Sequence, residues 1–424
     1  MKKIVALLVA CMLTITAIFA LVACTPKEDP AEVSATEAAI IKAQSMTLQE
    51  LEEASKAEMA ANPNAKFNAD SLTSGVKKAL AKFQEKYDWI TENNSAYNSK
   101  KGSEYQPKLI AAQQANQYIA DMVMIQDASF LKNAMLDTGF LLSYTPSGEG
   151  YQIGDGDKNP QVGVTFNKVF MYNNTVVDAE GGKQLTNVWQ LTGKDGANGK
   201  KGLTSKVSFQ NPLGEDINMS FLIMLTSPAA CEKLTSAYQS YFGTAYNGAE
   251  DDYQNIGYKF VAEFLANYQT HASDTSEVKA IGTYTDGHVM FAGLCKLKDY
   301  QGYKDAGNAA AYLANADVTA GGWNNQIEGF NGFVYNMWML IPKTANLPYT
   351  ACLFIRYMLG EEGYNAGWGG ILGYYSANQL IPSADGIDGL DLATWKNQCI
   401  VEDVNYIDSA YKSAVKFINL QLTK

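Results

Sequence analysis

The chain has 424 residues, of which 47% are hydrophobic, 11% aromatic and 18% charged, which excludes a disordered or collagen-like chain. Lysine and arginine number 33 against 44 aspartates and glutamates, and the net charge of −11 argues against nucleic-acid binding. The length predicts two or three lobes, each able to bury a core of its own.

Residues 1–23 have the pattern of an export signal. Lys2 and Lys3 precede an apolar stretch that ends in Leu21-Val22-Ala23, and Cys24 follows directly. The segment resembles a bacterial lipoprotein signal, which implies that cleavage leaves Cys24 as a lipidated first residue. We expect residues 24–36 to be a lipidated tether.

No later segment of the sequence reaches the roughly 18 uninterrupted apolar residues of a membrane-spanning helix. The sequence therefore predicts an extracytoplasmic protein, anchored to the cell membrane by the lipid on Cys24 rather than crossing it.

The mature chain begins with a helical pattern and continues with alternating strands and helices. Thr47, three residues before Glu50, has the spacing of a capping box. The expected elements are a helical segment at 37–61, a strand at 65–69, a helix from Val76 to Tyr87, a helix at 108–120, a strand at 121–126 and a helix after Ser129. Such alternation predicts a parallel sheet with helices on both faces.

Polar residues follow two of these strands. Ser71 and Thr73 come after the first strand, and Asp127 and Ser129 come after the strand at 121–126. Ligands of open α/β sheets bind outside the carboxyl ends of the strands, so these four residues are candidate ligand contacts. Each is also a good helix N-cap, and that alternative stays open.

Six segments, in order along the chain, resemble extracellular solute-binding proteins of bacterial ABC importers. The resemblance is to the branch that includes polyamine- and ferric-iron-binding proteins. The segments are Asp121 to Ser129, Lys168 to Thr175, Thr186 to Thr192, Val207 to Pro212, Ile327 to Pro342 and Gly373 to Asn378.

The resemblance implies an α/β, two-lobed, type II periplasmic-binding-protein fold. Each lobe would be a mixed, mostly parallel sheet with helices on both faces, and two hinge strands would join the lobes. Lobe 1 is expected at 37–168 and 336–424 and lobe 2 at 169–335, with the ligand cleft between them closing by hinge motion. The implied function is to capture a small solute and deliver it to ABC permease subunits, as a monomer without cofactor or enzymatic activity.

Further candidate ligand contacts are aromatic, amide and acidic residues. Aromatic faces suit both sugars and organic cations, and nearby carboxylates favour the cation. The candidates are Trp189, Trp323 and Tyr375 for aromatic faces, with Tyr335 and Tyr374 also considered, Asn174 and Asn218 for amide contacts, and Glu328 with Asp127 as counter-ions of an ammonium group. A polyamine or other organic cation is therefore the expected solute, with ferric iron or a sugar as alternatives; the iron alternative depends on Tyr374-Tyr375.

The sequence contains no recognisable catalytic or metal-binding motif. His271 and His288 are the only histidines and are not spaced as a ligand pair. The widely spaced Cys231, Cys295, Cys352 and Cys399 are expected to be buried free thiols, although two disulfides are an alternative. A non-transport surface lipoprotein, either an adhesin or a sensor, is the alternative function from another class.

Overall fold

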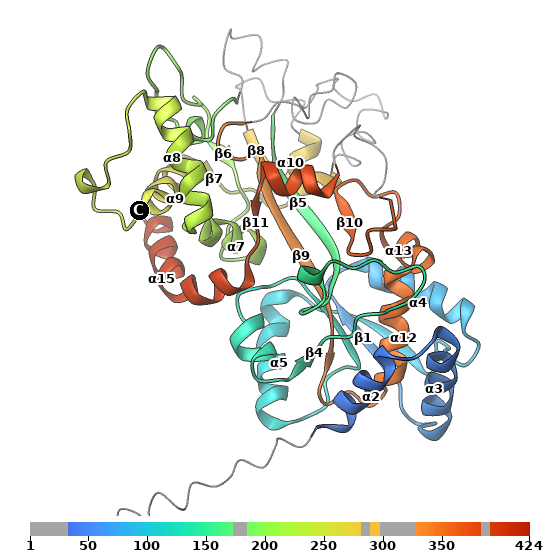
Figure 1. Ribbon diagram of the computed structural model, residues 1–424. Helices are drawn as coiled ribbons and strands as arrows, with labels where there is room; N and C mark the ends of the chain where they lie inside the picture. Colours follow the sequence, from blue (N-terminus) through green and yellow to red (C-terminus); the bar gives the residue numbers. More distant parts are fainter. Residues whose placement is uncertain (1–32, 173–184, 281–288, 297–326, 383–390) are drawn as a thin grey trace, which may run out of the picture.

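The computed structural model describes residues 33–172, 185–280, 289–296, 327–382 and 391–424 (Figure 1). The expected signal at 1–23, Cys24, Asn174 and Trp323 lie outside the described residues. Within the described ranges, no helix is both long enough and apolar enough to cross a membrane.

Helices and strands alternate along most of the chain. The α-helices are α2 (Ala35–Gln44), α3 (Leu48–Ala61), α4 (Ser74–Lys86), α5 (Gly102–Ala115), α7 (Asp216–Met224), α8 (Pro228–Phe242), α9 (Ile256–Ala266), α10 (Asp274–Ala280), α12 (Pro348–Leu359), α13 (Glu361–Trp368), α14 (Leu392–Gln398) and α15 (Val404–Leu422). The strands are β1 (Phe67–Ser71), β2 (Ser95–Ser99), β3 (Met122–Ile125), β4 (Leu141–Leu142), β5 (Val162–Tyr172), β6 (Val207–Ser208), β7 (Tyr268–Gln269), β8 (Val289–Gly293), β9 (Gly332–Pro342), β10 (Tyr374–Ser376) and β11 (Ile400–Val401). Short helices are the π-helix η1 (Leu131–Leu136) and the 3₁₀ turns η2 (Asp155–Asp157), η3 (Val188–Thr192), η4 (Gly248–Glu250) and η6 (Leu294–Lys296).

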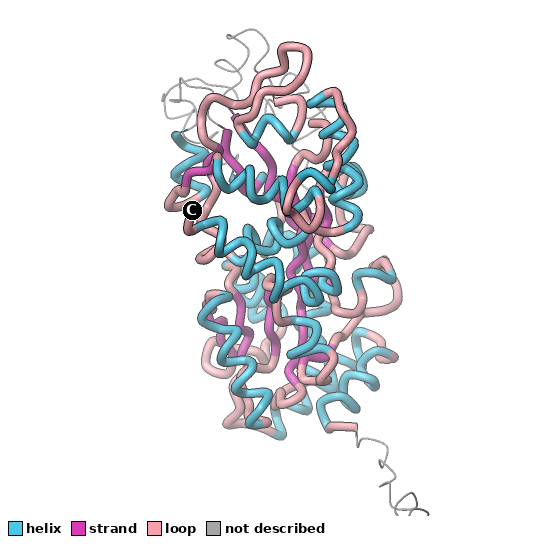
Figure 2. Tube along the Cα trace, turned by 90° about the vertical axis from the view of Figure 1, so that its left-hand side faces the viewer, coloured by secondary structure: helices cyan, strands magenta, loops and turns pink. Residues whose placement is uncertain are grey.

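One mixed sheet runs through the whole molecule, in the strand order β2-β1-β3-β9-β5-β8-β6-β7. β1 is parallel to β2 and β3, whereas β5 and β9 are antiparallel to each other over most of their length. In Figure 1 these two long strands pass from a lower lobe to an upper lobe. Figure 2 shows the strands in the middle of both lobes, with helices around them. The expected α/β architecture, with two lobes joined by two strands, is confirmed.

The lower lobe, hereafter lobe 1, contains α2–α5, β1–β3, α12 and α13 (Figure 1). Its core forms because the apolar residues of α4 recur at helical spacing. Val76, Leu80 and Phe83 are buried, and the Phe83 ring lies 5.0 Å from the ring of Phe354 on α12. The segment at 37–61 forms two helices, and the predicted capping box of Thr47 and Glu50 begins the second of them.

The upper lobe, hereafter lobe 2, contains α7–α10 and β6–β8 (Figure 1). Its core is rich in phenylalanine: the Phe221 ring of α7 stacks on Phe291 of β8 with centroids 4.6 Å apart, and Phe170 of β5 lies 5.0 Å from Phe291. One end of β5 supplies core residues to lobe 2, and its other end belongs to lobe 1. This strand therefore connects the two lobes.

The C-terminal helix α15 contacts both lobes. It packs against α7 and α9 of lobe 2 and against η1 of lobe 1. The expected boundaries at 168 and 336 fall within β5 and β9, which both lobes share. The residue ranges of the lobes stay a prediction.

In the described part of the chain, no disulfide joins the four cysteines. Cys231, Cys352 and Cys399 are free thiols, and the last two are buried.

Candidate functional site

The carboxyl end of β1 carries the first candidate residues. Ser71 is buried, and its Oγ accepts a hydrogen bond from the Thr73 N–H at 3.2 Å. Thr73 is the N-cap of α4, and its Oγ1 accepts from the Gly75 N–H at 3.2 Å. The side chain of Thr73 therefore caps helix α4, which is the alternative to a role as a ligand contact.

Asp127 lies beyond the carboxyl end of the neighbouring strand β3. Its Oδ1 accepts hydrogen bonds from the N–H of Ser129 at 2.9 Å and from the Ser129 hydroxyl at 2.6 Å. Burial raises the pKa of Asp127, although these two bonds stabilise its charged form. Ser71, Lys100, Gln126 and Asp127 line one small pocket, so the structure brings Ser71 and Asp127 together.

Two acidic residues stand at the start of a helix of lobe 2, and one of them, Asp216, lies near Asp127 of lobe 1. Asp216 is the first residue of α7, and Glu215 precedes it. Burial, followed by the negative charges of Asp127 and Glu215, raises the pKa of Asp216 to about 6. Asp127 and Glu215 therefore both lie close enough to Asp216 for their negative charges to oppose its ionisation. Sequence reasoning missed Glu215 and Asp216 because acidic residues are common in the first turn of any helix.

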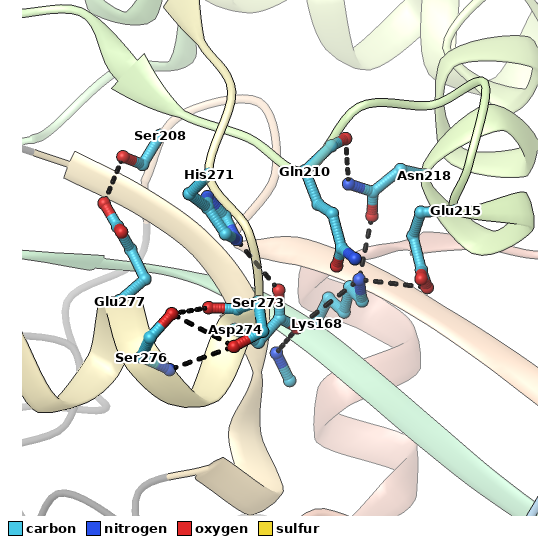
Figure 3. A network of polar contacts seen from close by, with 11 residues as sticks. Lys168, Ser208, Gln210, Glu215, Asn218, His271, Ser273, Asp274, Ser276 and Glu277 are labelled. Atoms are coloured by element: carbon cyan, nitrogen blue, oxygen red, sulfur yellow. Dashed lines mark hydrogen bonds and ion pairs between the residues drawn. The ribbon is translucent and has the colours of Figure 1, made fainter.

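Lys168 of β5 forms an ion pair with Glu215 of this acidic group (Figure 3). It is buried, and its Nζ lies 2.9 Å from Asn218 Oδ1, 3.4 Å from Glu215 Oε1 and 3.4 Å from Asp274 Oδ2. Asn218 is itself fully buried, and its amide donates to the Gln210 carbonyl at 2.8 Å. The candidate Asn218 thus holds Lys168 in place.

Asp274, the first residue of α10, anchors the other side of Lys168 (Figure 3). Burial alone raises its pKa, but Lys168, His271 and the N–H of Gly293 lower it to about 2. His271 Nε2 lies 3.1 Å from Asp274 Oδ1. The charge of Lys168 is therefore already shared between Asp274 and Glu215.

A row of aromatic rings lies on the same face of the sheet as Lys168. Phe166 is two residues before Lys168 on β5, so both side chains point to one face. Its register partners are Tyr335 on β9 and Tyr374 on β10, with ring centroids 5.4 Å and 4.2 Å from its own. Burial raises the pKa of both tyrosines, so their hydroxyls are protonated at neutral pH.

The other candidate ligand contacts in the described part of the chain lie in surroundings different from that of Asp127. Tyr375 points into a separate apolar cluster with Val169 and Trp395. Trp189 is completely buried in lobe 2, where its Nε1 donates to the Leu234 carbonyl at 3.0 Å. Glu328 is exposed and accepts from the Asn187 amide at 2.7 Å. The structure therefore does not bring these three residues together with Asp127.

In the described part of the chain, no three His, Cys, Asp or Glu side chains come close enough together to hold a metal ion. The carboxyl groups of Asp127, Glu215 and Asp216 thus interact through space without forming a compact ligand set.

No protein-family model matches the sequence, and no curated protein is similar to it in sequence. Solved structures with a similar fold include binding proteins. Iron-bound HitA from Pseudomonas aeruginosa gives a TM-score of 0.54 at 15% identity, over 84% of this chain and 99% of that chain. The apo ferric ion-binding protein A from Pasteurella haemolytica gives 0.56 at 14% identity, over 84% and 97% of the two chains. The periplasmic binding protein AfuA from Actinobacillus pleuropneumoniae, with bound fructose-6-phosphate, gives 0.55 at 14% identity, over 85% and 99%.

Proposed function

Because the chain has the fold of the two-lobed periplasmic binding proteins, we propose that it is the solute-binding component of an ABC importer. It captures a small solute between lobe 1 and lobe 2 and delivers it to the permease subunits. The proposed role is binding without catalysis, with no resident cofactor. Movement of the lobes about β5 and β9 would close the site around the solute.

We further propose that the solute is a cation, with a polyamine or another organic amine as the best candidate. The observation that carries this choice is that the negative charges of Asp127, in lobe 1, and Glu215, in lobe 2, both oppose ionisation of Asp216. Lys168 is the only ammonium group bonded to any of the three in the described structure, and it is shared with Asp274. A solute ammonium placed among these carboxylates would relieve the repulsion and hold the lobes together.

The aromatic row supports an organic amine. Phe166, Tyr335 and Tyr374 form a packed row of rings, and the charges of Glu215 and Asp274 act on Tyr335. A cation is attracted to aromatic ring faces when water is excluded. Ferric iron and a sugar or sugar phosphate stay the alternative solutes, because HitA and AfuA, which have this fold, were solved with iron and fructose-6-phosphate.

We also propose that the protein is tethered outside the cytoplasm by lipid on Cys24, as a monomer. Metabolic labelling with a radioactive fatty acid should label the full chain, and Cys24→Ala should abolish the label. Persistence of the label in the Cys24→Ala variant would overturn this part of the proposal.

A thermal-shift screen tests the solute class. The chain from Thr25 to Lys424 would be melted with putrescine, spermidine, a quaternary amine, ferric citrate, maltose and a sugar phosphate. A ligand at 100 times its dissociation constant stabilises the folded state by about 2.7 kcal/mol. A saturable shift with an amine supports the proposal, and a shift with only iron or a sugar phosphate selects an alternative. No shift across the panel would favour the surface lipoprotein without a transport role.

A further inference from the structure

β9, one of the two strands that pass between the lobes, changes its outer neighbour along its length. At its lobe 1 end it pairs with β3, where Trp338 is the register partner of Ile125. Toward its other end it pairs with β11, where Val334 is the register partner of Val401. In the described structure, neither of these neighbours pairs with residues 335–337. The outer edge of β9 therefore has a gap in its strand pairing between the two lobes.

β5, the other long strand, changes its outer neighbour at the same level. Residues 164–166 pair with β10, and residues 168–172 pair with β8 of lobe 2. Asn167 lies between these two runs and is the register partner of Val334. Its side chain is buried, and within the described ranges neither polar atom of its amide has a hydrogen-bond partner. Both strands thus have their weakest pairing at one level, which is where a hinge would bend.

The carboxyl group of Glu402 bridges the gap on β9. Glu402 directly follows β11, and its N–H donates to the Val334 carbonyl at 2.8 Å. Its Oε2 accepts the N–H of Asn336 at 2.9 Å, in the place of a strand carbonyl. The Asn336 side chain accepts in turn from the Thr165 hydroxyl of β5 at 2.8 Å. Glu402 therefore contacts β9 at the middle of its unpaired stretch.

Glu402 is buried and only partly satisfied by hydrogen bonds. It is 8% exposed, and its Oε1 has no hydrogen-bond partner in the part of the chain that the structure describes. Burial, together with the negative charge of Asp127, raises the pKa of Glu402 well above its ordinary value and favours the neutral form. A buried polar atom without a partner is unfavourable, and it gains hydrogen bonds once water reaches it.

The segment that carries Glu402 is fastened to lobe 2. Lys233 of α8 donates from its Nζ to the carbonyls of Asn397 and Cys399, just before β11, at 2.9 Å and 3.1 Å. α7 of lobe 2 packs against β11, and the two lie together in Figure 1. The hydrogen bond from Asn336 to Glu402 thus joins a segment held by lobe 2 to the strand that continues into lobe 1.

We infer that Glu402 is a positioning residue of the hinge, which limits the separation of the lobes by holding β9 at Asn336. This inference rests on the proposed movement of the lobes about β5 and β9, but it does not depend on which solute is bound. Because the strand pairing is already interrupted at residues 335–337, the side-chain contact is released without breaking a ladder. Release would let water reach the Glu402 carboxyl group and would free β9 to bend.

Hydrogen exchange and small-angle scattering of the purified full chain, without solute, test this inference. Glu402→Leu should speed amide exchange at residues 335–337 about tenfold, because the Asn336 N–H loses its acceptor, and should raise the radius of gyration. Glu402→Gln should behave as the wild type in both measurements, since its amide oxygen accepts the same hydrogen bond.

Two further variants complete the test. Thr47→Ala is the matched control: it removes a side-chain acceptor of the Glu50 N–H at the start of α3, so exchange should change there and not at residues 335–337. Glu402→Asp, whose carboxyl group is one methylene short of Asn336, should act in the same direction as Glu402→Leu. It takes the place of Glu402→Leu if that variant does not fold.

Unchanged exchange at residues 335–337 in Glu402→Leu would overturn the inference. So would faster exchange with an unchanged radius of gyration, because Glu402 would then support the sheet without positioning the lobes. A Glu402→Gln variant that behaves as Glu402→Leu does would show that the hydrogen bond is not the cause. The proposed function is judged separately by the thermal-shift screen of the wild type, so solute binding without these changes rejects the role of Glu402 alone.

Discussion

Gly102, at the start of α5 in lobe 1, lies directly against Asp216, at the start of α7 in lobe 2. A Cβ atom added to Gly102 would come within 2.7 Å of Asp216 Oδ2. The backbone of one lobe thus touches an acidic side chain of the other, beside the candidate cleft. The absence of a side chain at Gly102 permits the lobes to come this close.

Gly102→Val is therefore expected to hold the lobes apart. The added side chain would displace Asp216 and weaken solute binding about tenfold, which corresponds to about 1.4 kcal/mol. Small-angle scattering of the solute-loaded protein should show a larger radius of gyration than for the wild type. Gly156→Val is the matched control, because nothing lies within 4 Å of the Cβ position there. Unchanged scattering and affinity in Gly102→Val would show that this contact does not limit closure.

Stability should depend on pH through Asp216. Its pKa is raised to about 6 by burial and by Asp127 and Glu215, whereas its ordinary value is 3.8. The folded protein therefore binds this proton more tightly than the unfolded chain does, so stability rises as pH falls from 7 toward 4. Asp216→Asn should remove this contribution, leaving a smaller rise in melting temperature between pH 7 and pH 4. Identical pH profiles for the two proteins would contradict the placement of Asp216 among carboxylates.

Cation binding should have the opposite dependence on pH. A proton on Asp216 competes with the solute ammonium, and a group with a pKa of about 6 is about one-quarter ionised at pH 5.5. We expect the affinity at pH 5.5 to be about fourfold lower than at pH 7.5 when measured by calorimetry. In Asp216→Asn the affinity should be lower at both pH values and nearly independent of pH. A wild-type affinity that does not change with pH would exclude a direct contact between Asp216 and the solute.

Lys168→Met should destabilise the protein by about 3–5 kcal/mol at pH 7, because it leaves Asp274 buried without its cation. The pKa of Asp274 lies at about 2, below its ordinary value of 3.8. The stability that this pair contributes is therefore present above pH 4 and is lost as pH falls through about 2.

Urea unfolding at pH 7 and at pH 2.5 measures how much the ion pair of Lys168 and Asp274 contributes to stability. The difference in unfolding free energy between wild type and Lys168→Met should shrink at the lower pH. Lys416→Met, at an exposed position, should change stability by less than about 0.5 kcal/mol. A difference between wild type and Lys168→Met that is equal at the two pH values would mean that Lys168 acts through packing alone.

Strongly periodic elements of the fold were predictable from the sequence. The spacing of Val76, Leu80 and Phe83 predicted α4, and the apolar run at 121–126 predicted β3. β2 (Ser95–Ser99) was not predicted, because its sequence Ser-Ala-Tyr-Asn-Ser has no alternation of apolar residues. This strand is the edge of the sheet, where register with β1 rather than a buried face determines its structure.

The candidate site was predictable only where residues follow strands. Ser71 and Asp127 were found in this way, because adjacent parallel strands bring their carboxyl ends together. Glu215, Asp216 and Lys168 come from other parts of the chain and meet only through the tertiary fold. Trp189 looked suitable as an aromatic contact, but the sequence does not distinguish a ring in a cleft from a ring that fills a core.

Calorimetry with the amine that gives the largest thermal shift tests the central claim most directly. Wild type, Asp127→Asn and Glu215→Gln would be compared with Glu92→Gln, which neutralises an exposed acidic residue of lobe 1. Hydrogen bonds to charged groups contribute about 1.5–3 kcal/mol, so each cleft substitution should weaken binding at least tenfold. The control should bind as the wild type does. Wild-type affinity in both Asp127→Asn and Glu215→Gln would contradict capture of a cation between the lobes.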